Sequence, residues 1–198
     1  MKRYLFLLTV TFVTLFLMPA SSQGDQIVFT HEGIGGSGTI DGEFFEKVDF
    51  TIVAVGNTDE ITDFGSGFFL DHESVTIDLD GIGTFDFQVP TRTFVNNGSE
   101  VVGFSRGGDV GLDLFNGPFA GDFAKWDLTT SIGPVSGDAT LLQWADGNTP
   151  VVTSGGTLVF DSQSVPSTFT AVVGAIPEPS SAIVLIAMGC CLSARRRR

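Results

Sequence analysis

The chain has 198 residues, and its 23 acidic side chains outnumber 10 lysines and arginines, for a formal net charge of −13. The basic residues cluster at the two ends, so residues 23–176 hold only four cations against 22 acids, a net charge of −18. A body this acidic repels phosphate backbones and anionic lipids, which excludes nucleic acid and leaves cations or neutral polymers as expected partners. The hydrophobic content of 42% and 19 phenylalanines suffice for the core of one domain.

Residues 1–22 have the pattern of a secretory signal peptide. A charged start at Lys2 and Arg3 precedes an apolar run, which ends at Pro19. Small residues at Ala20 and Ser22 then provide the site that signal peptidase needs, with cleavage expected before Gln23.

Residues 23–175 alternate between apolar and polar side chains with a period of two, which predicts β-strands. The clearest case is a hairpin in which residues 75–79 and 84–89 flank an Asp-Gly turn. We expect about a dozen strands, an all-β fold, and a single antiparallel β-sandwich or jelly-roll-like domain over 23–175. The other predicted strands are Gln26–His31, Gly38–Phe45, Val48–Ala54, Thr91–Val95, Val101–Phe104, Val110–Phe115, Phe123–Thr130, Ala139–Trp144, Thr157–Asp161 and Thr168–Val173.

Two strings in the body match motifs of enzymes but lack their context. Gly33 to Gly38 matches G-x-G-x-x-G, yet a strand follows where a dinucleotide site needs a helix, so we expect a glycine-rich turn. Gly103 to Gly107 matches the G-x-S-x-G nucleophile elbow around Ser105, but both histidines precede that serine. We expect another turn there, while a triad of His72, an aspartate and Ser105 in a different order stays open.

The acidic body also raises the question of a calcium site, because calcium takes six to eight oxygen ligands. No ligand set is selected by the pattern, so the metal residues are unknown and no cofactor is required. The sequence also identifies no pair of catalytic carboxylates of the glycosidase type, since 22 acids offer many accidental pairs. The candidate calcium ligands are Asp59, Glu60, Asp71, His72, Glu73, Asp78, Asp80, Asp109 and Asp113.

Aromatic side chains offer a different type of site. Flat rings suit the faces of pyranose sugars, so Trp126, Trp144 and the exposed phenylalanines form a candidate sugar-stacking platform. The alternative is that these rings fill the core.

Residues 176–198 form an export tail. Pro177, Glu178 and Pro179 precede an apolar segment from Ala182 to Ala194, which is short for a membrane span. Four terminal arginines would hold the end of the expected short transmembrane helix in the cytoplasm. These are Arg195, Arg196, Arg197 and Arg198.

This tail resembles the PEP-CTERM sorting signal of bacterial exported proteins, which is also catalogued as an ice-binding-protein C-terminal domain. The resemblance implies that an exosortase, a membrane transpeptidase, recognises Pro177-Glu178-Pro179 and removes the helix. It also implies a producer of exopolysaccharide. The body resembles uncharacterised Gly/Thr/Phe-rich bodies of such proteins, with segments like that from Gly36 to Gly42.

We therefore expect a non-enzymatic exported protein, anchored transiently in the inner membrane and then delivered to the cell surface or extracellular matrix. Its body would be structural or adhesive. The alternative is a lectin-like module that binds exopolysaccharide, or a carbohydrate-active enzyme. The expected partners are signal peptidase, an exosortase-type enzyme, and exopolysaccharide or matrix.

Overall fold

The structure is a computed structural model that describes residues 24–108, 111–145 and 147–174. The predicted signal peptide with its cleavage site, and the predicted tail at 176–198, lie outside these residues. The described part is all-β, as predicted, with two short 3-10 turns. Nowhere in it does a helix combine the length and apolar character needed to cross a bilayer. The strands are β1 (Gln26–Ile40), β2 (Glu43–Asn57), β3 (Thr62–Asp63), β4 (Gly67–Asp71), β5 (Ser74–Leu79), β6 (Gly83–Asp86), β7 (Thr91–Asn96), β8 (Val101–Arg106), β9 (Asp113–Phe119), β10 (Ile132–Leu141), β11 (Val151–Thr153), β12 (Gly156–Phe160) and β13 (Gln163–Val173).

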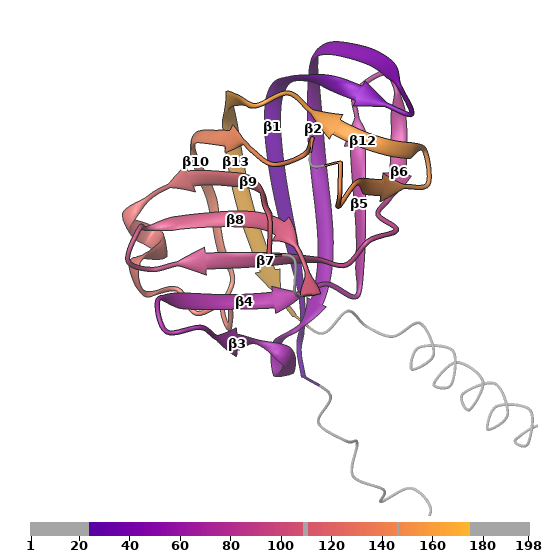
Figure 1. Ribbon diagram of the computed structural model, residues 1–198. Helices are drawn as coiled ribbons and strands as arrows, with labels where there is room; N and C mark the ends of the chain where they lie inside the picture. Colours follow the sequence, from indigo (N-terminus) through magenta and orange to yellow (C-terminus); the bar gives the residue numbers. More distant parts are fainter. Residues whose placement is uncertain (1–23, 109–110, 146, 175–198) are drawn as a thin grey trace, which may run out of the picture.

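The strands form one curled antiparallel sheet, instead of the two separate sheets expected of a β-sandwich. Its order is β3-β4-β7-β8-β9-β10-β13-β1-β2-β5-β6, with β11 and β12 branching from β1. The sheet bends back on itself, so that β4, β7, β8 and β9 run across β13, β1 and β2 (Figure 1). We call these the front layer and the back layer. The 15-residue strand β1 explains the continuity, because it pairs with β13 along its first half and with β12 at its end.

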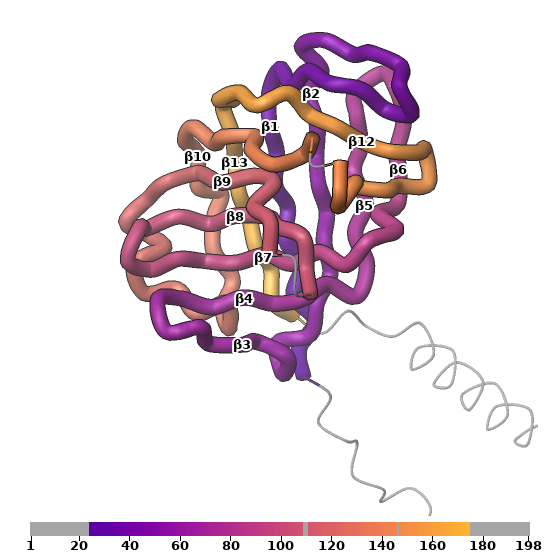
Figure 2. The backbone as a smooth tube through the Cα atoms, viewed as in Figure 1, coloured from indigo at the N-terminus to yellow at the C-terminus, as the bar shows by residue number. Residues whose placement is uncertain are grey.

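Backbone hydrogen bonds close one end of the molecule into a ring of strands. The ring runs β1-β2-β5-β6-β11-β12 and returns to β1 (Figure 2). Its last join is a bridge between Phe87 and Thr153, supported by the Ser154 amide, which donates to the Asp86 carbonyl at 2.8 Å. Within the described residues, this end of the sheet therefore offers no long unpaired edge to another chain.

The glycine-rich string at residues 33–38 is a bent part of β1, not the turn that the sequence suggested. The pairing of β1 with β2 shifts register on both sides of Gly36, and Gly35 has φ of +79°. A side chain on Gly33 would meet the ring of Phe50, and one on Gly36 would lie 2.8 Å from the ring of Phe160. These glycines therefore let two core rings pack directly against the backbone.

Aromatic rings join the two layers in a single apolar core. Phe50 of β2 lies 5.7 Å, between ring centroids, from Phe115 of β9, and 4.8 Å from Phe160 of β12. Each ring is essentially buried. Burial of large apolar side chains is the dominant favourable contribution to folding, so the curl of the sheet is held mainly by these contacts.

Two further predictions from the sequence were wrong. The predicted strand Phe123–Thr130 is absent, because residues 121–125 form a 3-10 turn and Leu128 takes a left-handed φ of +67°. The string Gly103 to Gly107, expected as a turn, lies mostly in strand β8.

Candidate functional site

A groove lined by aromatic and polar side chains lies on the outer face of the front layer. Its volume is about 300 Å³. We call it the aromatic groove and define it by Phe64, Phe69, Arg92, Phe94, Asn96, Ser105, Gly111 and Asp113.

Strand register brings these side chains together. Successive residues of a strand face opposite sides of a sheet, so alternate residues of β4, β7 and β8 point away from the core. Phe69 of β4 pairs with Phe94 of β7, and Arg92 of β7 pairs with Ser105 of β8. Ser105 in turn pairs with Asp113 of β9. The groove is therefore built from two neighbouring rows of residues that cross the front layer.

A glycine on the next strand gives Phe94 its position. Phe94 pairs with Gly103 of β8, and a side chain at Gly103 would collide with the Phe94 ring. The ring therefore lies against bare backbone. Beside it, Phe69 lies 6.3 Å from Phe64, whose side chain is 43% exposed. The groove thus presents a surface of three phenyl rings, one of them seated on the sheet.

Arg92 is engaged on three sides. Its Nε lies 3.1 Å from the Asp71 carboxylate, and its Nη2 donates to the Gly108 carbonyl oxygen at 2.8 Å. The guanidinium carbon lies 4.4 Å from the centroid of the Phe69 ring, a cation–π contact. The positive charge in the groove is therefore matched by a carboxylate, a carbonyl and a ring of the protein itself.

The opposite end of the groove carries hydrogen-bond acceptors. Asp113 accepts a hydrogen bond at Oδ2 from Nδ2 of Asn116, at 3.1 Å. This contact fixes the amide orientation, because a flipped Asn116 would place its oxygen against the carboxylate. Asn116 Oδ1 is then buried without a hydrogen-bond partner among the described residues. Rings beside hydrogen-bonding groups are the combination that recognises sugars, whose rings have apolar faces and hydroxyl edges.

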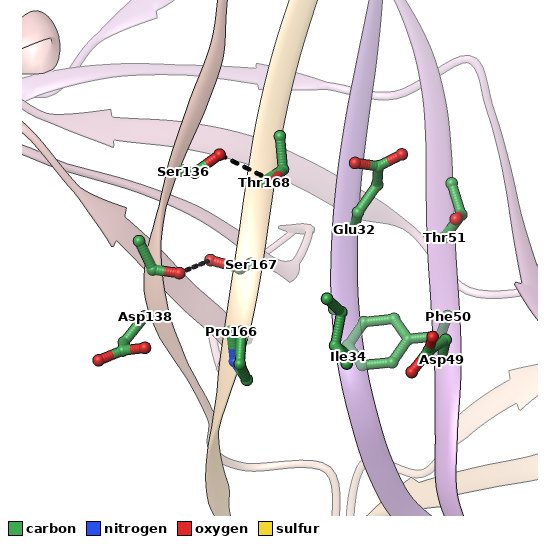
Figure 3. Close-up of a pocket in the computed structure, with 12 residues that line it drawn as sticks. Glu32, Ile34, Asp49, Phe50, Thr51, Ser136, Asp138, Pro166, Ser167 and Thr168 are labelled. Atoms are coloured by element: carbon green, nitrogen blue, oxygen red, sulfur yellow. Dashed lines mark hydrogen bonds between the residues drawn. The ribbon is translucent and has the colours of Figure 1, made fainter.

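A second groove, of about 560 Å³, crosses the outer face of the back layer (Figure 3). Ser136, Thr168, Glu32 and Thr51 occupy neighbouring positions on β10, β13, β1 and β2. Ser136 and Thr168 share a hydrogen bond of 3.1 Å. The only aromatic ring among the described residues of its lining, that of Phe50, is buried, so this groove lacks a stacking surface.

The tryptophans do not form the sugar platform proposed from the sequence. Trp126 is 5% exposed and Trp144 is fully buried. Their indole nitrogens donate to the carbonyl oxygens of Thr130, at 2.8 Å, and Leu114, at 2.6 Å. Both rings belong to the core, and the exposed phenylalanines alone carry the platform. Both tryptophans lie outside the strands, where strand periodicity does not indicate which side chains face the core.

Both histidines face the core side of the front layer. Nε2 of His31 and Nε2 of His72 lie 3.2 and 2.9 Å from Thr93 Oγ1, and Nδ1 of His72 lies 2.9 Å from Thr91 Oγ1. Ser105 points to the outer face. The triad of His72, an aspartate and Ser105 that the sequence left open is therefore not assembled.

Burial keeps both imidazoles neutral. Desolvation lowers the pKa of His31 from 6.5 to about 3. The pKa of His72 is also lowered to about 3, mainly by burial and further by the neighbouring His31 and Arg92.

The candidate calcium ligands do not gather in the structure. Among the described residues, no group of three or more histidine, cysteine, aspartate or glutamate side chains is placed to hold a metal ion. Asp71 pairs with Arg92, and Asp78 accepts a hydrogen bond from the Thr84 hydroxyl at 2.5 Å. Asp109 lies outside the described residues.

Comparison of the chain with protein-family models, with curated proteins and with solved structures finds no match in any of the three. The aromatic groove and the charge of the body therefore carry the functional argument.

Proposed function

We propose that the chain is an exported protein of the cell surface or extracellular matrix, and that its body binds a non-acidic polysaccharide without cleaving it. The aromatic groove is the observation that carries this proposal. Among the roles considered from the sequence, a structural or adhesive body, a polysaccharide-binding module and a carbohydrate-active enzyme, the groove favours binding.

The geometry of the groove suits an extended sugar chain. Phe94 is held on the backbone of Gly103, so its free face is set before any ligand arrives. Aromatic rings lose little conformational entropy on binding, which makes them effective contact surfaces for sugars. Asn96, Ser105 and Asp113 lie beside the rings and supply polar groups for hydroxyls.

The charge of the body restricts the polymer. With 22 acids and four cations in residues 23–176, a polyanion would meet net repulsion. Arg92 does not offset this repulsion, because Asp71 already pairs with it. Neutral or cationic glycans therefore remain as candidate ligands.

The sequence of the two ends supports export. The signal peptide predicted at 1–22 and the tail predicted at 176–198 would direct the chain to signal peptidase and then to an exosortase-type enzyme in the inner membrane. The resemblance of the tail to PEP-CTERM signals agrees with a polysaccharide-producing host, and so with a matrix glycan as partner.

The test is retention of the full chain on a panel of immobilised polysaccharides, in a polyoxyethylene detergent because sugar-headed detergents would compete. We expect retention on neutral or cationic glycans, no shortened products, and weaker retention of Phe64→Ala. The matched control is Phe44→Ala, which removes a phenyl ring that is 66% exposed but outside the groove.

Release of shortened glycans would overturn the non-enzymatic part of the proposal. Absence of retention on every glycan would overturn binding and return the body to a structural role. If Phe64→Ala and Phe44→Ala lose glycan retention to the same extent, the aromatic groove is not the binding site.

A further inference from the structure

We infer that the aromatic groove selects glycans whose sugars carry free amino groups. This inference rests on the proposed function and names the chemical class of its ligand. It follows from which hydrogen-bonding groups of the groove remain available.

The positive charge of the groove is already matched. Among the described residues of the lining, Arg92 is the only cation, and it is paired with the Asp71 carboxylate and donates to the Gly108 carbonyl. An acidic sugar would have to compete with Asp71 for this guanidinium. The groove therefore has no free positive group to offer a carboxylate or sulfate on a ligand.

An acceptor, in contrast, is unused. Asp113 uses Oδ2 to accept from Asn116, and within the described residues Oδ1 has no hydrogen-bond donor. An uncompensated carboxylate beside a ring favours a ligand that donates hydrogen bonds and carries positive charge.

An ammonium group satisfies both conditions at once. It carries three donors and a positive charge, so it makes a charge-assisted hydrogen bond to a carboxylate. The phenyl faces attract the same charge, as the contact of Arg92 with Phe69 already shows within this groove. The acidic body adds long-range attraction. A hydroxyl in the same place would donate one hydrogen bond to the carboxylate, but it carries no positive charge, so it would gain neither the attraction to the rings nor the attraction to the acidic body.

The test compares a glucosamine tetrasaccharide with its N-acetylated counterpart, which has the same sugar backbone but no charge. Binding to the full chain is measured by titration calorimetry at a pH where the amine is protonated. We expect the amine form to bind about tenfold more tightly, the usual gain from one hydrogen bond to a charged group. Asp113→Asn removes the charge and keeps an oxygen to accept from Asn116, so it should abolish most of that preference.

The matched control is Asp138→Asn, which removes the same charge from the groove of the back layer. If Asp138→Asn lowers the preference as much as Asp113→Asn, the amine is attracted by net charge alone and the inference is wrong. Equal affinity for the two tetrasaccharides would also overturn it while leaving polysaccharide binding intact. Binding of neither form in this assay, together with no retention on the panel, would overturn both proposals. If Asp113→Asn does not fold, Phe64→Ala provides an independent test, because loss of the Phe64 ring should weaken binding of the amine form.

Discussion

His31 and His72 meet at one atom, the hydroxyl oxygen of Thr93, although they come from β1 and from the turn after β4. A hydroxyl has one hydrogen, so it donates to at most one of the two rings. The arrangement that leaves no ring N–H without an acceptor has His31 Nε2–H donating to Thr93, Thr93 donating to His72 Nε2, and His72 Nδ1–H donating to Thr91. Only the lone pair at His31 Nδ1 is then unpartnered among the described residues. This chain of hydrogen bonds requires neutral imidazoles.

The first prediction is that acid destabilises the fold through these two rings. In the unfolded chain an imidazole takes up a proton near its ordinary pKa of 6.5, but in the fold only near 3. Between these values the unfolded state binds more protons, so the free energy of unfolding falls as pH drops below 6.5. We expect a loss of about 2 kcal/mol per histidine between pH 7 and pH 5, measured by urea unfolding.

His31→Leu is the control for this prediction. It removes one titrating group and keeps an apolar side chain among Phe104, Phe115 and Phe169. Carboxylate protonation affects both proteins alike, so the difference between their pH profiles isolates the imidazole. Identical profiles would show that His31 is not the acid-sensitive group.

The second prediction concerns two glycines that differ in what surrounds them. Gly38→Ala would drive a methyl group into the Val159 carbonyl of β12, which is backbone and cannot move aside, so we expect a loss of about 3 kcal/mol in the free energy of unfolding. Gly103→Ala meets the Phe94 side chain, which can rotate, so we expect about 1 kcal/mol together with loss of glycan retention. Denaturation and retention are measured on both variants. Normal glycan retention by Gly103→Ala would show that packing of the Phe94 ring on the Gly103 backbone does not matter for binding.

The third prediction is that salt stabilises the body. Eighteen uncompensated negative charges repel one another in the compact state, and the Debye length shrinks from ~30 Å at 0.01 M to ~8 Å at 0.15 M salt. The two ion pairs found in the described part involve exposed acids, Glu46 and Asp71, and offset little of this repulsion. The melting temperature should rise with sodium chloride. A flat profile would contradict the repulsion argument.

The fourth prediction follows from the sequence of the tail. In a host that has the processing enzyme, the mature protein should end near Pro177-Glu178-Pro179, with Arg195, Arg196, Arg197 and Arg198 removed. Intact-mass spectrometry of the surface fraction measures this directly. A mature chain that keeps its arginines would instead indicate a simple membrane anchor.

The sequence predicts strands well where one face is apolar and the other polar. The hairpin of β5 and β6 is confirmed, because Val75, Ile77 and Leu79 alternate with polar residues and a glycine turn follows. Strand β4 was missed, since its adjacent Phe68 and Phe69 break the alternation. Phe68 packs on the core, whereas Phe69 faces the groove, so both sides of this strand are apolar.

The aromatic groove was beyond reach of the sequence for a related reason. Phe94 and Val95 are neighbours in β7, and both are apolar. In the structure Val95 is fully buried, whereas Phe94 lies in the groove against the bare backbone of Gly103, its partner on another strand. A local pattern contains no information about that pairing. The excess of acidic residues, in contrast, is visible in the composition, and it directly restricts the charge of the proposed ligand.

The position of β13 bears on how the protein would respond to force. This strand is the last described element, and it lies between β1 and β10, with hydrogen bonds to both. Tension between a glycan held by the front layer and an attachment beyond residue 174 would pull along β13. Because the hydrogen bonds of an antiparallel ladder lie across the strand, both ladders would be sheared as a whole, not unzipped bond by bond. The last described strand is thus held on both sides by ladders that resist tension through shear.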